Sequence, residues 1–157
     1  MNTAGLNDRV VIVTGAAAGI GRATALRFAD EGARVACWDV SDEGRDTLLR
    51  DIASRGGEGI ALTVDVASVE SVRAATAATV ARFGRIDVLV NNAGIVRDAQ
   101  LVKSKAGAVV GEMSDEQWDA VIGVNLSGVF HCGRAVVPHM IAAGGGVILN
   151  EIGRAHV

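Results

Sequence analysis

The sequence predicts an α/β fold in which helices cover both faces of a doubly wound, mostly parallel sheet. Short apolar runs rich in β-branched residues alternate regularly with longer amphipathic segments of helical period. Half of the 157 residues are apolar and only 3% are aromatic, so small aliphatic side chains build the core. The alternation continues without an internal repeat or a Pro- or Ser-rich linker, which indicates a single domain.

The first half of the chain contains four of the expected strands. Each is a short apolar run that suits a strand buried on both faces. Glycines mark the ends of the first two helices, and Ser68 caps the third with Glu70 in its first turn. In order, the expected elements are strand 9–14, helix 21–31, strand 34–39, helix 42–54, strand 59–64, helix 69–83 and strand 85–90.

The second half is less regular. A loop over 94–113 contains the stretch SKAGAVVGEMS, which has the pattern of a small hairpin. Ser114 caps a helix that runs from 115 to about 142 and that Pro138 is expected to kink. Four apolar residues are expected on or near its buried side, namely Trp118, Val121, Ile122 and Val124. A fifth strand opens at 147–149 and would present an exposed apolar edge.

Charge and composition argue against several classes of protein. The net charge of −3 gives no electrostatic footprint for nucleic acid or for an anionic membrane. The sparse basic cluster of Arg97, Lys103 and Lys105 fits a solvated loop. The first residues lack the pattern of a signal peptide, and no apolar stretch is expected to reach membrane-spanning length. We therefore expect a cytoplasmic protein with neither nucleic-acid nor membrane partners.

The two cysteines form no disulfide framework. Cys37 lies in an apolar run and is expected to be a buried structural thiol. The spacing of His131, Cys132 and His139 matches no usual ligand pattern, so we expect no metal site.

A glycine-rich turn, TGAAAGIG at Thr14–Gly21, joins the first strand to the first helix. Glycines let the backbone turn sharply and let phosphates approach, and a helix N-terminus supplies free N–H groups and a partial positive charge. The strand–turn–helix context indicates a dinucleotide-binding turn. Asp39 ends the second strand, where a carboxylate can accept hydrogen bonds from ribose hydroxyls and repel a 2′-phosphate. An ordinary strand-end residue is the alternative interpretation of Asp39.

Four motifs in this order resemble those of the short-chain dehydrogenases/reductases. They are the TGxxxGxG turn, Asp65-Val66 after the third strand, Asn91-Asn92-Ala93-Gly94 after the fourth strand, and Asn125 in GVNLSGVF. The resemblance covers about residues 6 to 150 and implies a Rossmann-type fold. The stretches NNAGIVRDAQL and NLSGVFHCGRAVVPHMI are most similar to the 3-oxoacyl-[acyl-carrier-protein] reductase group.

The resemblance implies a set of cofactor-contacting residues, and it assigns Asn125 to the catalytic set. The pyrophosphate, adenosine ribose, adenine and nicotinamide ribose would lie along this set in chain order. Its members are Gly15, Ala17, Ala18, Gly19, Ile20, Gly21, Asp39, Val40, Asp65, Val66, Asn92, Ala93 and Gly94. NADP-preferring relatives often carry a basic residue where this chain has Ala18, so NAD is favoured over NADP.

Each of these polar residues also has a purely local interpretation. Asp65 could cap the turn that follows it. Asn91 and Asn92 could satisfy loop backbone groups, and Asn125 could bond to a neighbouring strand.

The resemblance further implies hydride transfer between nicotinamide and a hydroxyl or oxo carbon, with a Lys-activated Tyr as acid–base group and a Ser that orients the substrate. This chain has no tyrosine and no YxxxK motif, and Glu151 follows the fifth strand. We expect a full-length homotetramer or homodimer that acts on a small-molecule or acyl-thioester substrate. The chain as written is expected to be truncated after the fifth strand and inactive.

The last seven residues, EIGRAHV at 151–157, have a specific interpretation. They back-translate to GAG ATC GGA AGA GCA CAC GTC, which resembles a short-read sequencing adapter that continues with an in-frame stop. We therefore expect a dinucleotide-binding domain over 1–150 and a non-native tail over 151–157. A natural or engineered truncation with an arbitrary tail is the alternative.

Two other functional classes compete with a dehydrogenase. A stand-alone NAD-binding module needs the same glycine turn and Asp39 but no Tyr or Lys. A purely structural or interaction protein would leave the cofactor motifs unexplained and ranks last.

Overall fold

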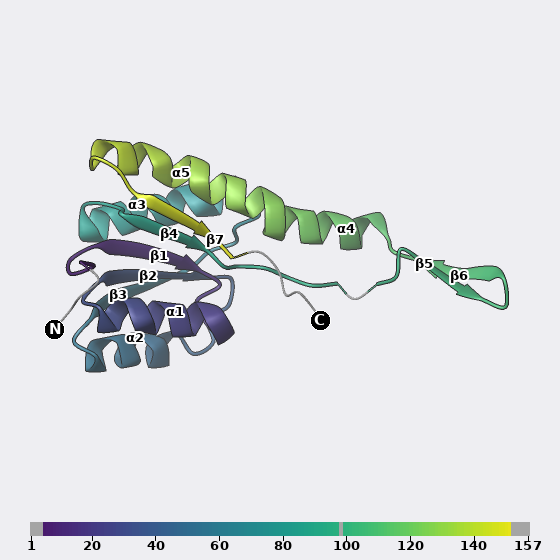
Figure 1. The fold of residues 1–157 in the computed structure, drawn as a ribbon, viewed down its shortest axis with the longest axis horizontal. Helices are drawn as coiled ribbons and strands as arrows, with labels where there is room; N and C mark the ends of the chain where they lie inside the picture. The colour runs from purple at the N-terminus through teal and green to yellow at the C-terminus, as the bar shows by residue number, and fades with distance from the viewer. Residues whose placement is uncertain (1–4, 98, 152–157) are drawn as a thin grey trace.

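A parallel five-stranded sheet forms the centre of the molecule (Figure 1). The computed structural model describes residues 5–97 and 99–151. The strand order is β3-β2-β1-β4-β7, and every neighbouring pair is parallel, which confirms the predicted doubly wound sheet. The strands are β1 (Val10–Thr14), β2 (Arg34–Asp39), β3 (Glu58–Thr63), β4 (Val88–Asn91) and β7 (Val147–Asn150).

Helices cover both faces of this sheet, as expected (Figure 1). One face carries α1 (Gly19–Asp30) and α2 (Arg45–Ser54). The other carries α3 (Val69–Phe83) and α5 (Gly128–Ala142). Because successive side chains of a strand point to opposite faces, the core divides into two clusters, one on each side of the sheet.

The central strand β1 contributes to both clusters, and all of its residues are buried. Val10 and Ile12 pack with side chains of α3 and α5. Val11 and Val13 pack with side chains of α1 and α2. The continuous apolar run that predicted a strand buried on both faces therefore has the expected environment.

Two helices begin at residues other than the predicted ones. α1 begins at Gly19 rather than Gly21, because Ala18 is extended and the backbone becomes helical from the next residue. α2 begins at Arg45 rather than residue 42, because Gly44 precedes it in the left-handed conformation with φ of 73°.

The single helix predicted from 115 to about 142 is divided into three parts. α4 (Asp115–Ile122) is followed by a five-residue π-helical turn, η1 (Gly123–Ser127), and then by α5. Ser114 caps α4 with a capping box, as expected. Pro138 lies within α5, and an interruption of α-helical geometry falls at η1.

The predicted buried side of this helix is wrong for α4, which has no buried residue. The side chain of Trp118 is 57% exposed, and Val121, Ile122 and Val124 are only partly buried. The reason is tertiary, because α4 extends past the carboxyl ends of the strands and has no sheet beneath it (Figure 1).

The prediction that no apolar stretch reaches membrane-spanning length is also corrected. The continuous helical stretch Asp115–Ala142 has 28 residues and a mean hydropathy of 1.4 over its most apolar window, of which 17% is buried. By length and composition alone, this stretch meets the requirements of a membrane span.

A two-stranded antiparallel hairpin occupies the loop between β4 and α4, which confirms the predicted hairpin. It consists of β5 (Val102–Lys105) and β6 (Ala108–Glu112), and all residues of both strands are exposed. Ala106 and Gly107 form the turn with φ of 51° and 81°. Positive φ at both central residues is the geometry of a type I′ turn, which a non-glycine residue adopts at some cost.

β7 is the edge strand of the sheet and pairs with β4 alone. Its apolar residues Val147, Ile148 and Leu149 are exposed, as predicted for the fifth strand. An exposed parallel edge leaves a row of backbone groups open to pairing with another chain.

A buried carboxylate links the amino ends of β1 and β4. Asp87 is 5% exposed. Its oxygens accept hydrogen bonds from the backbone N–H of Val10 at 2.9 Å, from Arg9 at 2.9 Å and from Arg85 at 2.6 Å. Burial alone would raise the pKa of Asp87, but these hydrogen bonds, led by the one from Arg85, outweigh burial and hold the pKa below its ordinary value.

We expect Asp87→Asn to lower the free energy of unfolding by about 3 kcal/mol, because it leaves the arginine groups without their buried counter-charge. Urea denaturation near neutral pH measures this loss. Asp119→Asn removes an exposed carboxylate from α4 and should change stability by less than about 0.5 kcal/mol.

The loss should also depend on pH. Since the pKa of Asp87 is lower in the folded state, its contribution is complete above the unfolded value of about 4 and disappears as the pH falls through the folded value. The unsubstituted chain and Asp87→Asn should therefore have similar free energies of unfolding in acid. Equal stability of Asp87→Asn and Asp119→Asn near neutral pH would contradict this role.

Candidate functional site

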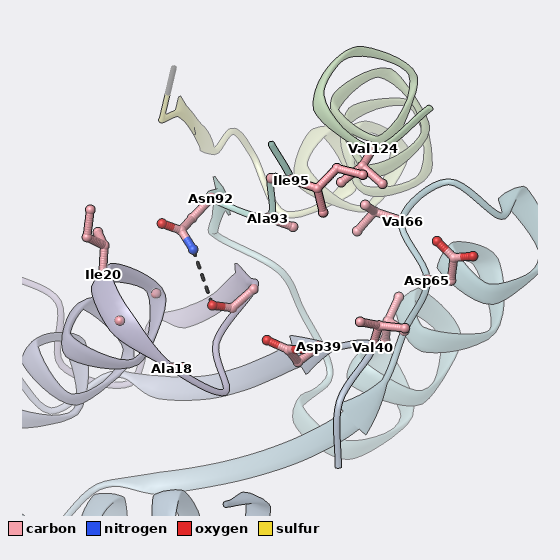
Figure 2. A pocket seen from close by; sticks show the side chains of 15 residues that line it. Ala18, Ile20, Asp39, Val40, Asp65, Val66, Asn92, Ala93, Ile95 and Val124 are labelled. Atoms are coloured by element: carbon pink, nitrogen blue, oxygen red, sulfur yellow. Dashed lines mark hydrogen bonds between the residues drawn. The ribbon is translucent and has the colours of Figure 1, made fainter. Parts of the chain in front are cut away.

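A cavity of about 600 Å³ opens at the carboxyl edge of the sheet (Figure 2). β2 and β3 lie on one side of β1 in the sheet, and β4 and β7 lie on the other side. The cavity lies at β1, where the order of the strands reverses. Such a switch point is the usual position of ligand sites in open α/β sheets. The lining residues are Gly15, Ala18, Gly19, Ile20, Gly21, Asp39, Val40, Val64, Asp65, Val66, Asn92, Ala93, Gly94, Ile95 and Val124.

The glycine-rich turn after β1 owes its shape to two glycines with different roles. Gly15 has φ of +66°, and a Cβ there would lie 2.9 Å from the Ala93 Cα. A Cβ on Gly21 would lie 2.1 Å from the Gly15 carbonyl oxygen. The first glycine therefore permits the turn, and the second permits α1 to pack directly on it.

The N-terminus of α1 is open toward the cavity. Its N-cap residue, Ala18, provides no side-chain hydrogen bond, and the first turn contains no acidic residue. The first N–H groups of a helix have no intrahelical acceptor, and the helix dipole places partial positive charge there. Gly19 and Ile20 are exposed at this end. The arrangement suits an anionic group such as a phosphate.

The hydroxyl of Thr14 links the end of β1 to the segment after β4. Its Oγ1 accepts hydrogen bonds from the backbone N–H groups of Asn92 at 3.0 Å and Ala93 at 2.9 Å. The side-chain amide of Asn92 in turn donates to the carbonyl oxygen of Thr14 at 3.0 Å. It also donates to the carbonyl oxygen of Gly15 at 3.2 Å (Figure 2). Asn92 therefore satisfies loop backbone groups, as its local interpretation stated, and it also lines the cavity.

Asp39 faces the glycine turn across the cavity floor (Figure 2). Its Oδ2 accepts a hydrogen bond from the Ala17 N–H at 2.8 Å, and its Oδ1 accepts one from the Ser41 N–H at 2.9 Å. Each carboxylate oxygen can accept a further hydrogen bond. Ala17 is the one predicted cofactor residue that does not line the cavity, and it contacts the site through Asp39.

The segment after β3 forms the opposite side of the cavity. Asp65 is exposed, and its Oδ1 accepts a hydrogen bond from the Ala67 N–H at 2.9 Å, so its carboxylate caps the following turn as the local interpretation stated. Val66 is buried and contributes both to the core and to the lining.

Asn125 lies in the π-helical turn η1, outside the cavity lining. Its Oδ1 accepts a hydrogen bond from the Ile95 N–H at 2.8 Å, and its Nδ2 donates to the Ile95 carbonyl at 2.9 Å. These two bonds hold the segment after β4 against the helix. Asn125 is exposed and bonds to a loop, not to a strand as its local interpretation supposed.

Sequence reasoning missed three lining residues, Val64, Ile95 and Val124. Each is an apolar residue next to a predicted motif, and adjacency was the only signal available. The role of Thr14 in joining two strand ends was also missed, because its partners are 78 and 79 residues away.

Both cysteines are buried, which confirms the prediction for Cys37. Burial raises the pKa of each thiol to about 12, so neither forms a reactive thiolate near neutral pH. Among the described residues, no group of three or more His, Cys, Asp or Glu side chains is placed to hold a metal ion.

The sheet order, the glycine turn and the cavity at the switch point define a Rossmann-like α/β domain. The family model for short chain dehydrogenase matches residues 9–153, and the chain therefore belongs to the short-chain dehydrogenase family.

Several known proteins are similar to this chain. The 3-oxoacyl-[acyl-carrier-protein] reductase FabG of Thermotoga maritima is 44% identical over 145 residues, which cover 92% of this chain and 55% of the relative. The D-threitol dehydrogenase of Mycolicibacterium smegmatis is 41% identical over 150 residues, which cover 96% and 54%. A crystal structure of NAD+-bound xylitol dehydrogenase aligns with a TM-score of 0.81 at 34% identity, over 93% of this chain and 53% of the other. The chain thus spans about half the length of the relatives it matches.

We expect Thr14→Val to lower the free energy of unfolding by about 3 kcal/mol, because the N–H groups of Asn92 and Ala93 lose their acceptor. Thr14→Ser keeps the hydroxyl and should lose no more than about 1 kcal/mol for the missing methyl group. Urea denaturation of the three proteins tests this difference. Equal stability of the Val and Ser variants would show that the hydroxyl does not hold the two strand ends together.

Proposed function

We propose that the cavity binds NAD, with its pyrophosphate at the open N-terminus of α1. The observation that carries this proposal is the pairing of an uncapped helix start with a carboxylate, Asp39, across a turn in which Gly15 and Gly21 leave no room for a Cβ. The helix start suits an anion, and the carboxylate suits the hydroxyl groups of a ribose. The residues present therefore fit a dinucleotide.

Within this proposal, the lining divides by chain segment. The backbone over 15–21 lies beside the pyrophosphate. Asp39 and Val40 lie beside the adenosine ribose. Asp65 and Val66 flank the adenine, and Asn92, Ala93 and Gly94 lie beside the nicotinamide ribose. The order of these segments around the cavity supports the assignment (Figure 2).

NAD is the proposed cofactor in preference to NADP. The negative charge of the Asp39 carboxylate would repel a 2′-phosphate on the adenosine ribose. The residue before Gly19 is Ala18, which offers no cationic group that could bind a 2′-phosphate.

We expect NADH to bind at least about tenfold more tightly than NADPH, a difference of about 1.4 kcal/mol. Asp39→Asn should narrow this ratio, because it removes the repelling charge and keeps an oxygen that can accept a hydrogen bond. Isothermal titration calorimetry measures both affinities. Glu43→Gln removes an exposed charge four residues later and should leave the ratio unchanged. Equal affinity for both nucleotides, or no binding of either, would refute the proposal.

The proposed activity of the whole protein is hydride transfer between NAD and a substrate with a hydroxyl or oxo group. NAD supplies the hydride acceptor or donor when it is bound. The residues of this chain bind and orient it, and Asn125 fixes the loop beside the nicotinamide end through Ile95. The reductase and dehydrogenase names of the relatives support this activity, and the reductases favour a 3-oxoacyl thioester substrate.

A cytoplasmic location and a homotetrameric or homodimeric assembly belong to the same proposal. Both rest on the family resemblance. The domain boundary at residue 150 remains a prediction, and most of the predicted tail, 152–157, lies outside the described residues.

Cofactor binding without turnover is the second candidate for these 157 residues. It is favoured by the absence of any tyrosine, since the family's acid–base group is a Tyr.

We expect no turnover when the chain is mixed with NADH and a panel of ketones and 3-oxoacyl esters, or with NAD and the matching alcohols. The reason is that the chain has no tyrosine, the residue that serves as the family's acid–base group. The loss or gain of NADH absorbance measures the rate, and calorimetry on the same sample verifies that NADH binds. A rate of about 1 s⁻¹ or more, as in ordinary enzymes, would contradict the expectation.

A further inference from the structure

A histidine on α5 reaches the backbone of the segment that forms one side of the cavity. The Nδ1 atom of His131 lies 3.1 Å from the carbonyl oxygen of Val66. A carbonyl can only accept a hydrogen bond, so the proton of the neutral ring must be on Nδ1. This contact fixes both the tautomer and the ring orientation of His131.

The two residues before Val66 form hydrogen bonds with β2 and with the first turn of α3. The Val64 N–H donates to the Asp39 carbonyl at 2.8 Å, which joins the segment to β2. The Asp65 N–H donates to the Ser71 hydroxyl at 3.0 Å, which joins it to α3. The bond from His131 adds the link to α5 at the residue whose side chain lines the cavity.

Packing brings α5 and this segment into direct contact at a second point. A Cβ on Gly128 would lie 2.8 Å from Val66 Cγ2, so a glycine is required there for α5 to approach so closely. Gly128 lies one helical turn before His131. Val66 therefore contacts α5 at two points. Its side chain packs against Gly128, and its carbonyl oxygen accepts the hydrogen bond from His131.

The core does not account for His131. The side chains of α5 that fill the core are those of Cys132, Val136 and Met140, while His131 is only partly buried. Its polar contact is directed at a carbonyl in the cavity segment and not at another helix.

We propose that His131 is a positioning residue, which sets the place of Val66 against the adenine of bound NAD. The proposal rests on the function proposed above. Because the Val66 carbonyl is bonded to His131 and the N–H groups of Val64 and Asp65 are bonded to other elements, the Val66 side chain presents a preformed apolar surface to a flat ring. Loss of the His131 bond would let this surface move, and ligands with an adenine would lose affinity while the nicotinamide end would not.

The test compares His131→Leu with His131→Asn. Leu fills similar space without a donor, whereas the Asn amide nitrogen can occupy the position of Nδ1. His139→Leu is the matched control, because His139 lies two turns further along α5, near Arg73 and Thr76 of α3. Calorimetry with NADH, with AMP and with nicotinamide mononucleotide reports the two ends of the site separately.

We expect His131→Leu to weaken NADH and AMP binding about five- to tenfold, the effect of one lost hydrogen bond. Nicotinamide mononucleotide should bind with unchanged affinity, His131→Asn should restore most of the loss, and His139→Leu should behave as the unsubstituted protein. A merely structural role would weaken all three ligands together, and this outcome would overturn the proposal.

Two further outcomes separate this proposal from the proposed function. If the unsubstituted chain binds no NADH, both fail. If it binds NADH and His131→Leu binds equally well, only the role of His131 fails. Nitrogen-15 NMR of the unsubstituted chain tests the geometry without any variant, because a neutral His131 carrying its proton on Nε2 would also overturn the proposal.

Discussion

The geometry of the cavity depends on one hydroxyl group. Thr14 ends β1, and its Oγ1 accepts from two successive backbone N–H groups after β4. Parallel neighbours in a sheet are joined by hydrogen bonds only along the strands, and nothing in the ladder fixes the loops that leave their ends. The Thr14 hydroxyl extends the pairing of β1 and β4 into the loops, and so places the glycine turn against Asn92 and Ala93.

The polar residues of the site serve the fold and the cavity at the same time. Asp39 accepts from the glycine turn, Asp65 caps its own turn, and Asn125 holds Ile95. For Asp39 and Asp65, which both line the cavity, these local hydrogen bonds are compatible with a functional role. Hydrogen bonds that orient these side chains before a ligand arrives reduce the ordering that binding must otherwise impose. A site of this kind is preorganised by the same contacts that stabilise the loops.

Periodic patterns predicted which elements form, including the hairpin and α4 beyond the sheet, but they predicted burial correctly only where the sheet lies against the element. The buried strands and the glycine turn could be read from the sequence, because burial on both faces leaves a continuous apolar run. Trp118 has the spacing of a buried residue, yet α4 extends past the sheet and leaves it exposed. Ala106 gave no turn signal, because the left-handed conformation it adopts is usual for Gly or Asn. The contacts of Thr14 and His131 span more than 60 residues, and no local pattern encodes them.

The π-helical turn has a consequence for how related chains should be aligned. In a π-helix the hydrogen bond spans one residue more than in an α-helix, so η1 is equivalent to a single inserted residue between α4 and α5. Removing one residue there would restore the α-helical period and rotate Asn125 away from Ile95. A one-residue gap at this place in an alignment therefore marks a different site geometry, whereas a gap in the exposed hairpin of β5 and β6 marks only a different surface.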